Sequence, residues 1–244
     1  MFGRNIGTPG FPDPQGSYAY GSRAIVTDRT FLNAVFMWMT GGLLLSGFTA
    51  ALVAVSPGLS EPLFTNSALR WGLIIAQLGA VIYLSARIEK MSLATARFTF
   101  LAYSILTGYT LSIVFLIYTQ SSLFATFVVA GGTFGLTAAW AHATNRDLSR
   151  MGNLLFMALI GLILASVVNI FFASSTLYWI TTYVGVLLFV GLTAYDTQQL
   201  KRLGQSELAG GERGQKLAIL GALRLYLDFI NLFLMLLRIM GSRR

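Results

Sequence analysis

Three ionisable residues lie inside apolar sequence near the end of the chain, and carboxylates in such surroundings can hold a proton or a cation. Asp228 lies near the middle of the apolar segment 217–240, with Arg224 four positions before it, and Asp196 ends the preceding apolar run, 177–196. A charged side chain at the centre of a bilayer costs at least about 2.5 kcal/mol, so it is expected to face the protein interior and to have a partner. These residues are therefore the candidates for proton exchange or ion binding.

The spacing of the polar residues in 217–240 places them on one side of a helix. Separations of four and three put Arg224, Asp228 and Asn231 on one stripe. If 177–196 and 217–240 are antiparallel neighbours, Asp196 and Asp228 lie in the same half of the membrane. Two carboxylates that meet in a low-dielectric interior cannot both ionise freely, so we expect them to share one proton and to titrate as a unit.

Each aspartate also has a structural interpretation. Asp196 could cap the end of its helix or pair with Lys201 or Arg202 in the headgroup region. Asp228 could be held by Arg224 alone, one turn away. Both alternatives remain open from the residues themselves.

The sequence contains few residues that could form a metal site or an enzyme active site. The chain has no cysteine and one histidine, His142, which cannot build a zinc site alone. The pair Tyr195 and Asp196 matches half of the signature of intramembrane aspartyl proteases, but leucine, tyrosine and leucine precede Asp228 where that family has a glycine motif. No serine-hydrolase motif, zinc-protease motif or phosphate-binding glycine loop is present. We expect a protein that is not an enzyme and has no cofactor.

The composition predicts an all-α, polytopic integral membrane protein. Hydrophobic residues make up 55% of the 244, charged residues 11%, and the mean hydropathy is +0.70. We expect a disordered cytoplasmic tail over 1–30 and a seven-helix transmembrane domain over 31–244, with a long polar loop at 197–216. The seven expected spans are 31–55, 71–86, 98–118, 123–143, 154–172, 177–196 and 217–240.

Basic residues indicate the orientation. Before the last span, twelve Lys and Arg residues fall on the side of the N-terminus, and only Arg70 falls on the other. The positive-inside rule places the N-terminus in the cytoplasm. We therefore interpret the net charge of +8 as a topology signal, with membrane lipid and not nucleic acid as the partner. A full last span would place the C-terminus outside, whereas a re-entrant path would return it to the cytoplasm.

Small residues four positions apart can let membrane helices approach closely. Gly72 with Ala76 and Gly131 with Gly135 have this spacing. We interpret both pairs as helix packing positions.

Three segments resemble one known family. VGLTAYDTQQLKRL, LYLDFINLFLMLLRIMG and NRDLSRMGNLLFMALIGLILASVVNIF are similar to the Bax inhibitor-1 family, in particular its bacterial membrane-protein branch, and the resemblance covers 31–241. It implies a seven-helix fold whose last helix is wrapped by the other six, and a pH-sensitive calcium leak. Asp196 and Asp228 would be its proton-sharing pair and a weak, transient site for calcium, and Arg87 would be a latch partner for Asp196 in the closed form.

The resemblance leaves two functions to weigh. We favour a pH-sensitive leak for calcium or other cations in the bacterial inner membrane, with Tyr195 and Asn231 as supporting polar residues. The alternative is a non-conducting regulator, because bacterial relatives have been linked to restraint of a membrane-bound ATP-dependent protease. Arg224 departs from the family pattern, which has a small or neutral residue there. As an internal ion-pair partner it would partly neutralise the site that calcium would visit.

Overall fold

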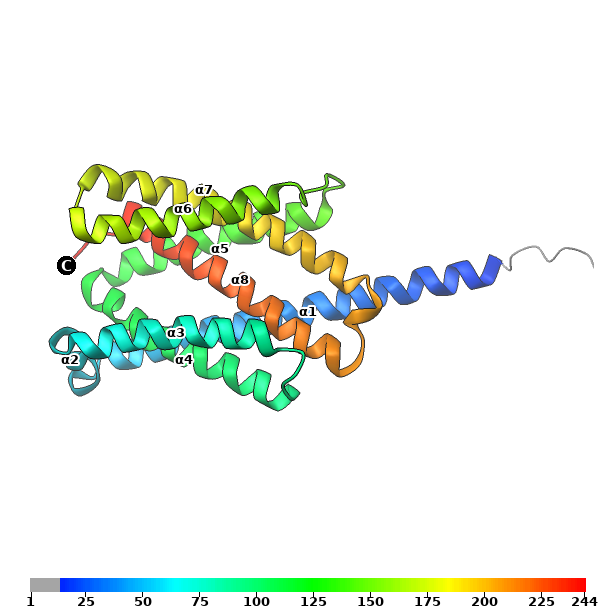
Figure 1. Ribbon diagram of the computed structural model, residues 1–244, viewed down its shortest axis with the longest axis horizontal. Coiled ribbons are helices and arrows are strands. Elements are labelled where there is room, and N and C mark those ends of the chain that lie inside the picture. The colour runs from blue at the N-terminus through cyan, green and yellow to red at the C-terminus, as the bar shows by residue number, and fades with distance from the viewer. Residues whose placement is uncertain (1–13) are drawn as a thin grey trace, which may run out of the picture.

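The computed structural model describes the backbone of residues 14–244 and the side chains of residues 30–244. Every regular element in this range is helical (Figure 1). The elements are α1 (Pro14–Ala54), α2 (Pro57–Thr65), α3 (Ser67–Arg87), α4 (Leu93–Ile117), α5 (Gln120–Ala143), α6 (Met151–Phe172), α7 (Ser175–Gly204), the short 3-10 helix η1 (Glu207–Ala209) and α8 (Gly211–Met240).

Seven of these helices are long and apolar enough to cross a membrane. Each of the seven expected spans falls on one of them, with ends that differ by a few residues, and the all-α prediction is confirmed. The short α2 is an addition that the apolar pattern did not indicate. It follows the first span, and Asn66 ends it and starts α3, where its side-chain Oδ1 accepts a hydrogen bond from the backbone of Leu69 at 3.0 Å.

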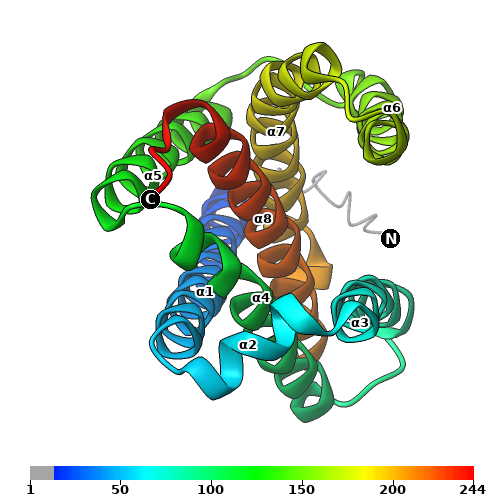
Figure 2. The same cartoon turned by 90° about the vertical axis from the view of Figure 1, so that its left-hand side faces the viewer.

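Helix α8 occupies the centre of the bundle, as expected. Figure 2 shows α1, α3 and α4 on one side of it and α5, α6 and α7 on the other. It packs against α7, α1, α5 and α4 and touches α3, and Leu225, Leu232 and Leu237 are at most 1% exposed. The other spanning helices are more exposed than α8, because their outer faces are the apolar surface of the bundle.

The two ends of the long polar loop differ from the expectation. Helix α7 continues to Gly204 and α8 begins at Gly211, so only six residues, 205–210, join them, and the expected loop 197–216 was wrong. The polar residues after Asp196 stay helical because their side chains bond to neighbouring segments, as described below.

The N-terminal tail is only partly described. Helix α1 begins at Pro14, so 14–30 has a helical backbone where we expected disorder, and proline is well suited to the first turn of a helix. Residues 1–13 lie outside the described residues. The division of the chain at residue 30 stays a prediction.

The last helix crosses the whole bundle. Its C-terminal end meets the α4–α5 connection, where the backbone N–H of Thr119 donates to the carbonyl of Ser242 at 3.0 Å. The connection 205–210 lies at the opposite end (Figure 1). The geometry of α8 is therefore that of a full span and not of a re-entrant segment.

Close helix approaches occur at glycines other than those we expected. A Cβ atom on Gly108 of α4 would lie 2.5 Å from the carbonyl oxygen of Ser46 in α1. Around Gly72, Gly131 and Gly135, in contrast, a Cβ atom would meet nothing within 4 Å. The interpretation of those glycine pairs as packing positions was wrong, because these glycines lie on open surfaces of their helices.

Candidate functional site

Asp228 is the most unusual residue of the bundle. Its relative exposure is 5%, and the residues one turn away on either side, Leu225 and Leu232, are completely buried. Its Oδ2 atom has no hydrogen-bond partner. Leaving a buried polar atom unpaired costs about 1–3 kcal/mol, and more for a charged group, so this position carries a cost that an apolar residue would avoid.

Asp196 lies on α7, which packs beside α8 along much of its length (Figure 2). It is half-buried, and its carboxyl group is close enough to that of Asp228 for the two to interact electrostatically. Within residues 30–244 no hydrogen bond joins the two side chains. The structure thus brings the two aspartates into one site without a direct bond between them.

Arg224 is the cation of this site. Its charge interacts with both Asp196 and Asp228, although its side chain is exposed. No ion pair within 4 Å is formed by Arg224 in the described part of the chain. The arginine therefore acts at a distance on both carboxyl groups, from the turn of α8 that precedes Asp228.

Arg87 forms no ion pair with Asp196 among the described residues. It ends α3 and is exposed, and α3 packs mainly against α4. Among the described side chains, none forms a hydrogen bond or an ion pair with the Arg87 guanidinium. The expected latch between Arg87 and Asp196 is absent from this conformation, and Arg224 supplies the positive charge instead.

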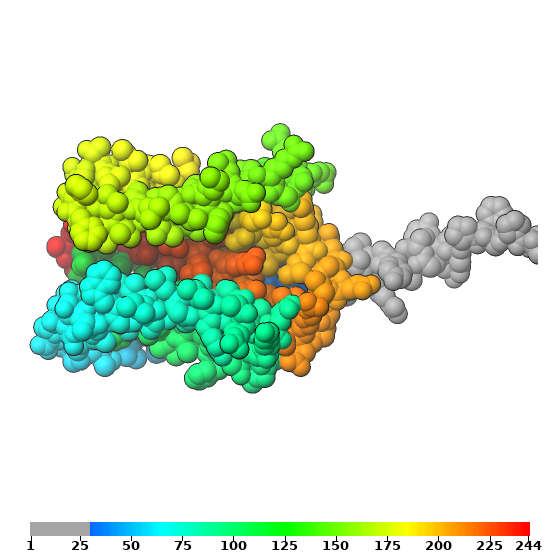
Figure 3. Space-filling model, in the orientation of Figure 1, coloured from blue at the N-terminus to red at the C-terminus, as the bar shows by residue number. Residues whose placement is uncertain are grey.

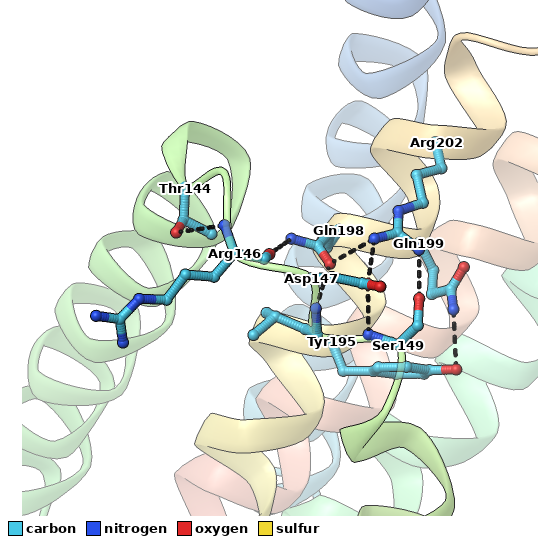
Figure 4. Close-up of polar contacts among 9 residues, drawn as sticks. Thr144, Arg146, Asp147, Ser149, Tyr195, Gln198, Gln199 and Arg202 are labelled. Carbon is cyan, nitrogen blue, oxygen red and sulfur yellow. Dashed lines mark hydrogen bonds and ion pairs between the residues drawn. The ribbon is translucent and has the colours of Figure 1, made fainter.

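The two supporting residues point elsewhere. The hydroxyl of Tyr195 accepts a hydrogen bond from Gln199 Nε2 at 2.9 Å (Figure 4), and its ring packs against Gly152 of α6. Asn231 donates to the carbonyl of Leu227 on its own helix at 2.9 Å. Neither side chain is hydrogen-bonded to an aspartate of the pair.

The residues after Asp196 anchor the loop between α5 and α6, which the sequence analysis missed. Gln198 accepts from the backbone N–H of Leu148 at 2.8 Å and donates to the carbonyl of Arg146 at 2.7 Å (Figure 4). Arg202, one turn later, pairs with Asp147 at 2.5 Å. Their spacing of four residues after an apolar span was the signal available.

Lys201 is also engaged, because its Nζ donates to the carbonyl of His142 at 2.6 Å. Neither Lys201 nor Arg202 pairs with Asp196, and Asp196 lies two turns before the end of α7 at Gly204. The structural interpretations of Asp196 as a cap or a headgroup ion pair were therefore wrong. The loop contact perturbs Asp147 instead: the bond from Arg202 lowers the pKa of Asp147 from 3.8 to about 2, with help from the N–H of Ser149.

Comparison with known proteins decides the family. Residues 28–244 match the model of the family described as Bax1-I, inhibitor of apoptosis-promoting Bax1. The chain belongs to the Bax1-I family.

Relatives within the Bax1-I family share most of the chain. The inner membrane protein YbhL of Escherichia coli K12 is 54% identical over 217 residues, which are 88% of this chain and 93% of the relative. Uncharacterized proteins of Borreliella burgdorferi and Deinococcus radiodurans are each 42% identical, over 220 and 215 residues. These matches cover 90% and 88% of this chain and 95% and 91% of the relatives. With seven spans and these relatives, this Bax1-I protein is an integral membrane protein.

The chemistry open to the site follows from its donors. In the part of the chain that the structure describes, no group of three or more His, Cys, Asp or Glu side chains could hold a metal ion. Tight calcium sites gather six to eight oxygens, which two carboxyl groups do not provide. The pair in this Bax1-I protein is suited to exchanging a proton or contacting a passing cation.

Proposed function

We propose that this Bax1-I protein is a pH-sensitive cation leak of the bacterial inner membrane, with Asp196 and Asp228 as its sensor and calcium as a permeant ion. One observation carries the proposal: Asp228 is buried at the centre of the bundle with an unpartnered Oδ2 and interacts electrostatically with Asp196. A conducting path needs a site that attracts a cation weakly enough to release it. Two carboxyl groups fit that need.

The proposed gate is the protonation state of the pair. At acid pH the two carboxyl groups share a proton, which lowers their negative charge and their attraction for a cation. At higher pH both ionise, and the site admits a cation. Leu225 and Leu232 are completely buried one turn on either side of Asp228, so an ion that reaches it must displace apolar side chains, as expected of a leak with low basal flux.

Arg224 is the internal counter-ion in this proposal. Because its charge acts on both carboxyl groups, it competes with an entering cation when the pair is ionised. In this proposal Arg224 is the positive partner of Asp196, the role that the resemblance assigned to Arg87. Conduction then requires Arg224 to move away from the pair, which its exposed position permits.

Orientation is part of the proposal. The basic residues at the ends of α3, α5 and α7 gather on the side of the N-terminus, which places this side in the cytoplasm. The sensor then lies in the cytoplasmic half of the protein, because Tyr195 packs beside Gly152, near the start of α6. The pair would respond to cytoplasmic pH.

Flux from purified protein tests the proposal. In liposomes, we expect the wild type to release calcium with a steep dependence on pH between about 6 and 8. Asp228→Asn keeps the side-chain shape and removes the titratable group, so its profile should be flat. Asp147→Asn makes the same change at an exposed loop outside the site and should leave the profile unchanged.

Two outcomes would contradict the proposal, the first for the leak and the second for its sensor. Absence of calcium and potassium flux at every pH would favour the non-conducting regulator of an ATP-dependent membrane protease. Of its expected contact, the tail from Met1 to Arg29, the structure describes only the backbone of 14–29. An Asp228→Asn protein with the wild-type profile would instead show that the pair is not the sensor.

A further inference from the structure

A large cleft opens sideways between α1 and α5, on the side of the bundle away from α3 and α6 (Figure 2). Its volume is about 890 Å³, and its inner wall is closed by α7 and α8. Most of its lining is apolar. Phe127 and Phe134 of α5 pack edge to face against Phe229 of α8, with ring centroids 5.6 and 5.7 Å apart. The cleft is therefore shaped as an apolar slot within the membrane-spanning region.

A groove on another side of the bundle differs from the α1–α5 cleft, so the cleft is more than a general gap between helices. Figure 3 shows α8 at the bottom of a groove between α3 and α6. On α8 itself, Arg224 is exposed and Asn231 is half-buried. The α1–α5 cleft instead combines a long apolar part, interrupted on α1 by Thr40, with a cluster of polar groups at one end, which is the pattern of an amphiphile.

The polar end of the cleft lies toward the connection 205–210. It contains His142, the last residue but one of α5, together with Asn33 and Thr197. Lys201 adds a positive charge there, since its Nζ donates to the carbonyl of His142 at 2.6 Å. The acidic residue of the adjoining loop, Asp147, is already paired with Arg202.

Thr197 has an unpartnered polar atom that a ligand in the cleft could bind. It lines the cleft, it is 1% exposed, and its Oγ1 has no hydrogen-bond partner. Thr193, one turn earlier on α7, is equally buried but donates to the carbonyl of Phe189 at 2.7 Å. A buried hydroxyl without a partner is unfavourable. Because Oγ1 is enclosed in this conformation, an acceptor in the cleft removes that penalty once the side chain turns its hydroxyl toward the cleft.

We propose that the α1–α5 cleft is a binding site for one anionic phospholipid of the leaflet on the side of the α7–α8 connection. An acyl chain lies along Phe127 and Phe134, its ester carbonyl accepts from Thr197 Oγ1, and its phosphate lies near Lys201 and His142. Lys201 follows Thr197 by four positions, a rise of about 6 Å along the helix. The charge of Lys201 thus lies at the membrane interface, and the hydroxyl of Thr197 is the first polar group one helical turn deeper in the membrane.

This site differs from the annular lipid that covers any membrane protein. A bound lipid is held by a specific donor, Thr197, and by a slot that excludes other positions. Thr197 follows Asp196 directly in the chain. Occupancy of the cleft by lipid can be measured by crosslinking, without any flux assay. The inference does not depend on the proposed leak.

Two glycines allow the cleft to be filled without strain. Gly47 and Gly135 line it, and a Cβ atom on either would meet nothing within 4 Å. Gly47→Phe with Gly135→Phe therefore places two rings in the slot. Gly41→Phe with Gly132→Phe is the matched control, because these glycines lie on the same two helices, have equal space and do not line the cleft.

Photo-crosslinking measures the occupancy. The full chain is reconstituted in vesicles of phosphatidylethanolamine and phosphatidylglycerol that contain a small fraction of phosphatidylglycerol with a diazirine in one acyl chain. We expect the crosslinked peptides to come several-fold more from the cleft walls than from the exposed outer face of α6. Gly47→Phe with Gly135→Phe should abolish this excess, and the control pair should retain it.

The hydroxyl is tested by competition. Ester-linked phosphatidylglycerol should displace the probe better than its ether-linked analogue, which lacks the carbonyl, by about fivefold, as expected for one hydrogen bond. Thr197→Val should remove this preference and should fold normally because its hydroxyl has no partner in the protein. Thr193→Val, the matched control, should keep the preference.

Three results would overturn the site. Labelling of the cleft no greater than that of the α6 face would mean annular lipid only. An equal preference for ester lipid in the wild type and in Thr197→Val would remove the role of the hydroxyl. Labelling of the cleft that disappears because a second copy of the chain covers it, seen as a protein dimer on crosslinking, would assign the cleft to an interface between copies.

Discussion

The hydroxyl oxygens of Tyr226 and Ser46 lie 2.6 Å apart and join α8 to α1 across 180 positions of the chain. Ser46 also donates to the carbonyl of Ser104 in α4 at 2.7 Å. Tyr226 is completely buried, and its ring packs edge to face against Phe100 and Tyr103, with centroids 6.1 and 5.8 Å away. One tyrosine of the central helix thus connects three helices of the bundle.

Removing this hydroxyl should loosen the bundle. Tyr226→Phe keeps the ring contacts but leaves the acceptor side of Ser46 unpaired in a dry interior, so we expect a loss of about 1–3 kcal/mol in stability. Thermal unfolding in detergent micelles measures it. Tyr109→Phe is the control, since its hydroxyl bonds the carbonyl of Leu59 at 2.9 Å near the surface, and it should cost less. Equal losses in both variants would contradict the interhelical role of Tyr226.

The side of the C-terminus can be read with single cysteines, because the chain has none of its own. Ser242 and Glu207 are both exposed, and they lie at opposite ends of α8. We expect a membrane-impermeant thiol reagent to label Ser242→Cys from the periplasmic side and Glu207→Cys only after the membrane is opened. Labelling of both from the same side would contradict the full span of α8.

The membrane spans could be predicted from the sequence because each depends only on the apolar composition and length of one continuous segment. A run of apolar residues long enough to cross a bilayer has few alternatives to a helix. The packing of the helices was not readable in this way: the spacing of Gly131 and Gly135 suggested an interface, but Gly135 lines an open cleft. The close contacts occur at Gly42 and Gly108, whose small neighbours at that spacing are serines, Ser46 for the first and Ser104 and Ser112 for the second.

The site was predicted in part. The burial of Asp228 and its proximity to Asp196 follow from the cost of a charge in the membrane and the antiparallel order of α7 and α8. The sequence did not indicate which cation acts on the pair. In the described part of the chain Arg224 interacts electrostatically with both carboxyl groups, whereas Arg87 ends α3, which packs mainly against α4. The cleft beside Thr197 has no signature in the sequence, since it is formed by four helices.

Acid should release the α5–α6 loop. Arg202 lowers the pKa of Asp147 from 3.8 to about 2, so the ionised form favours the folded loop. This contribution is complete above about pH 4 and is lost as the pH falls through about 2. The protection factors of the Leu148 and Ser149 amides, which compare the measured exchange with its intrinsic rate at the same pH, should fall over this range in the wild type. In Asp147→Asn they should be low throughout, and equal wild-type protection at pH 2 and pH 5 would contradict the assignment.

Arg224 gives the sharpest test of the proposed sensor. Its charge acts on both Asp196 and Asp228, and a nearby cation favours ionised carboxyl groups. Arg224→Ser removes that charge, so the pair should hold its proton at higher pH, and the pH of half-maximal calcium flux should rise. Arg224→Lys keeps the charge and should stay near the wild-type profile. Calcium release from liposomes between about pH 6 and 8 measures both variants. If the serine and lysine variants shift equally, size and not charge matters at this position, and the electrostatic role of Arg224 is wrong.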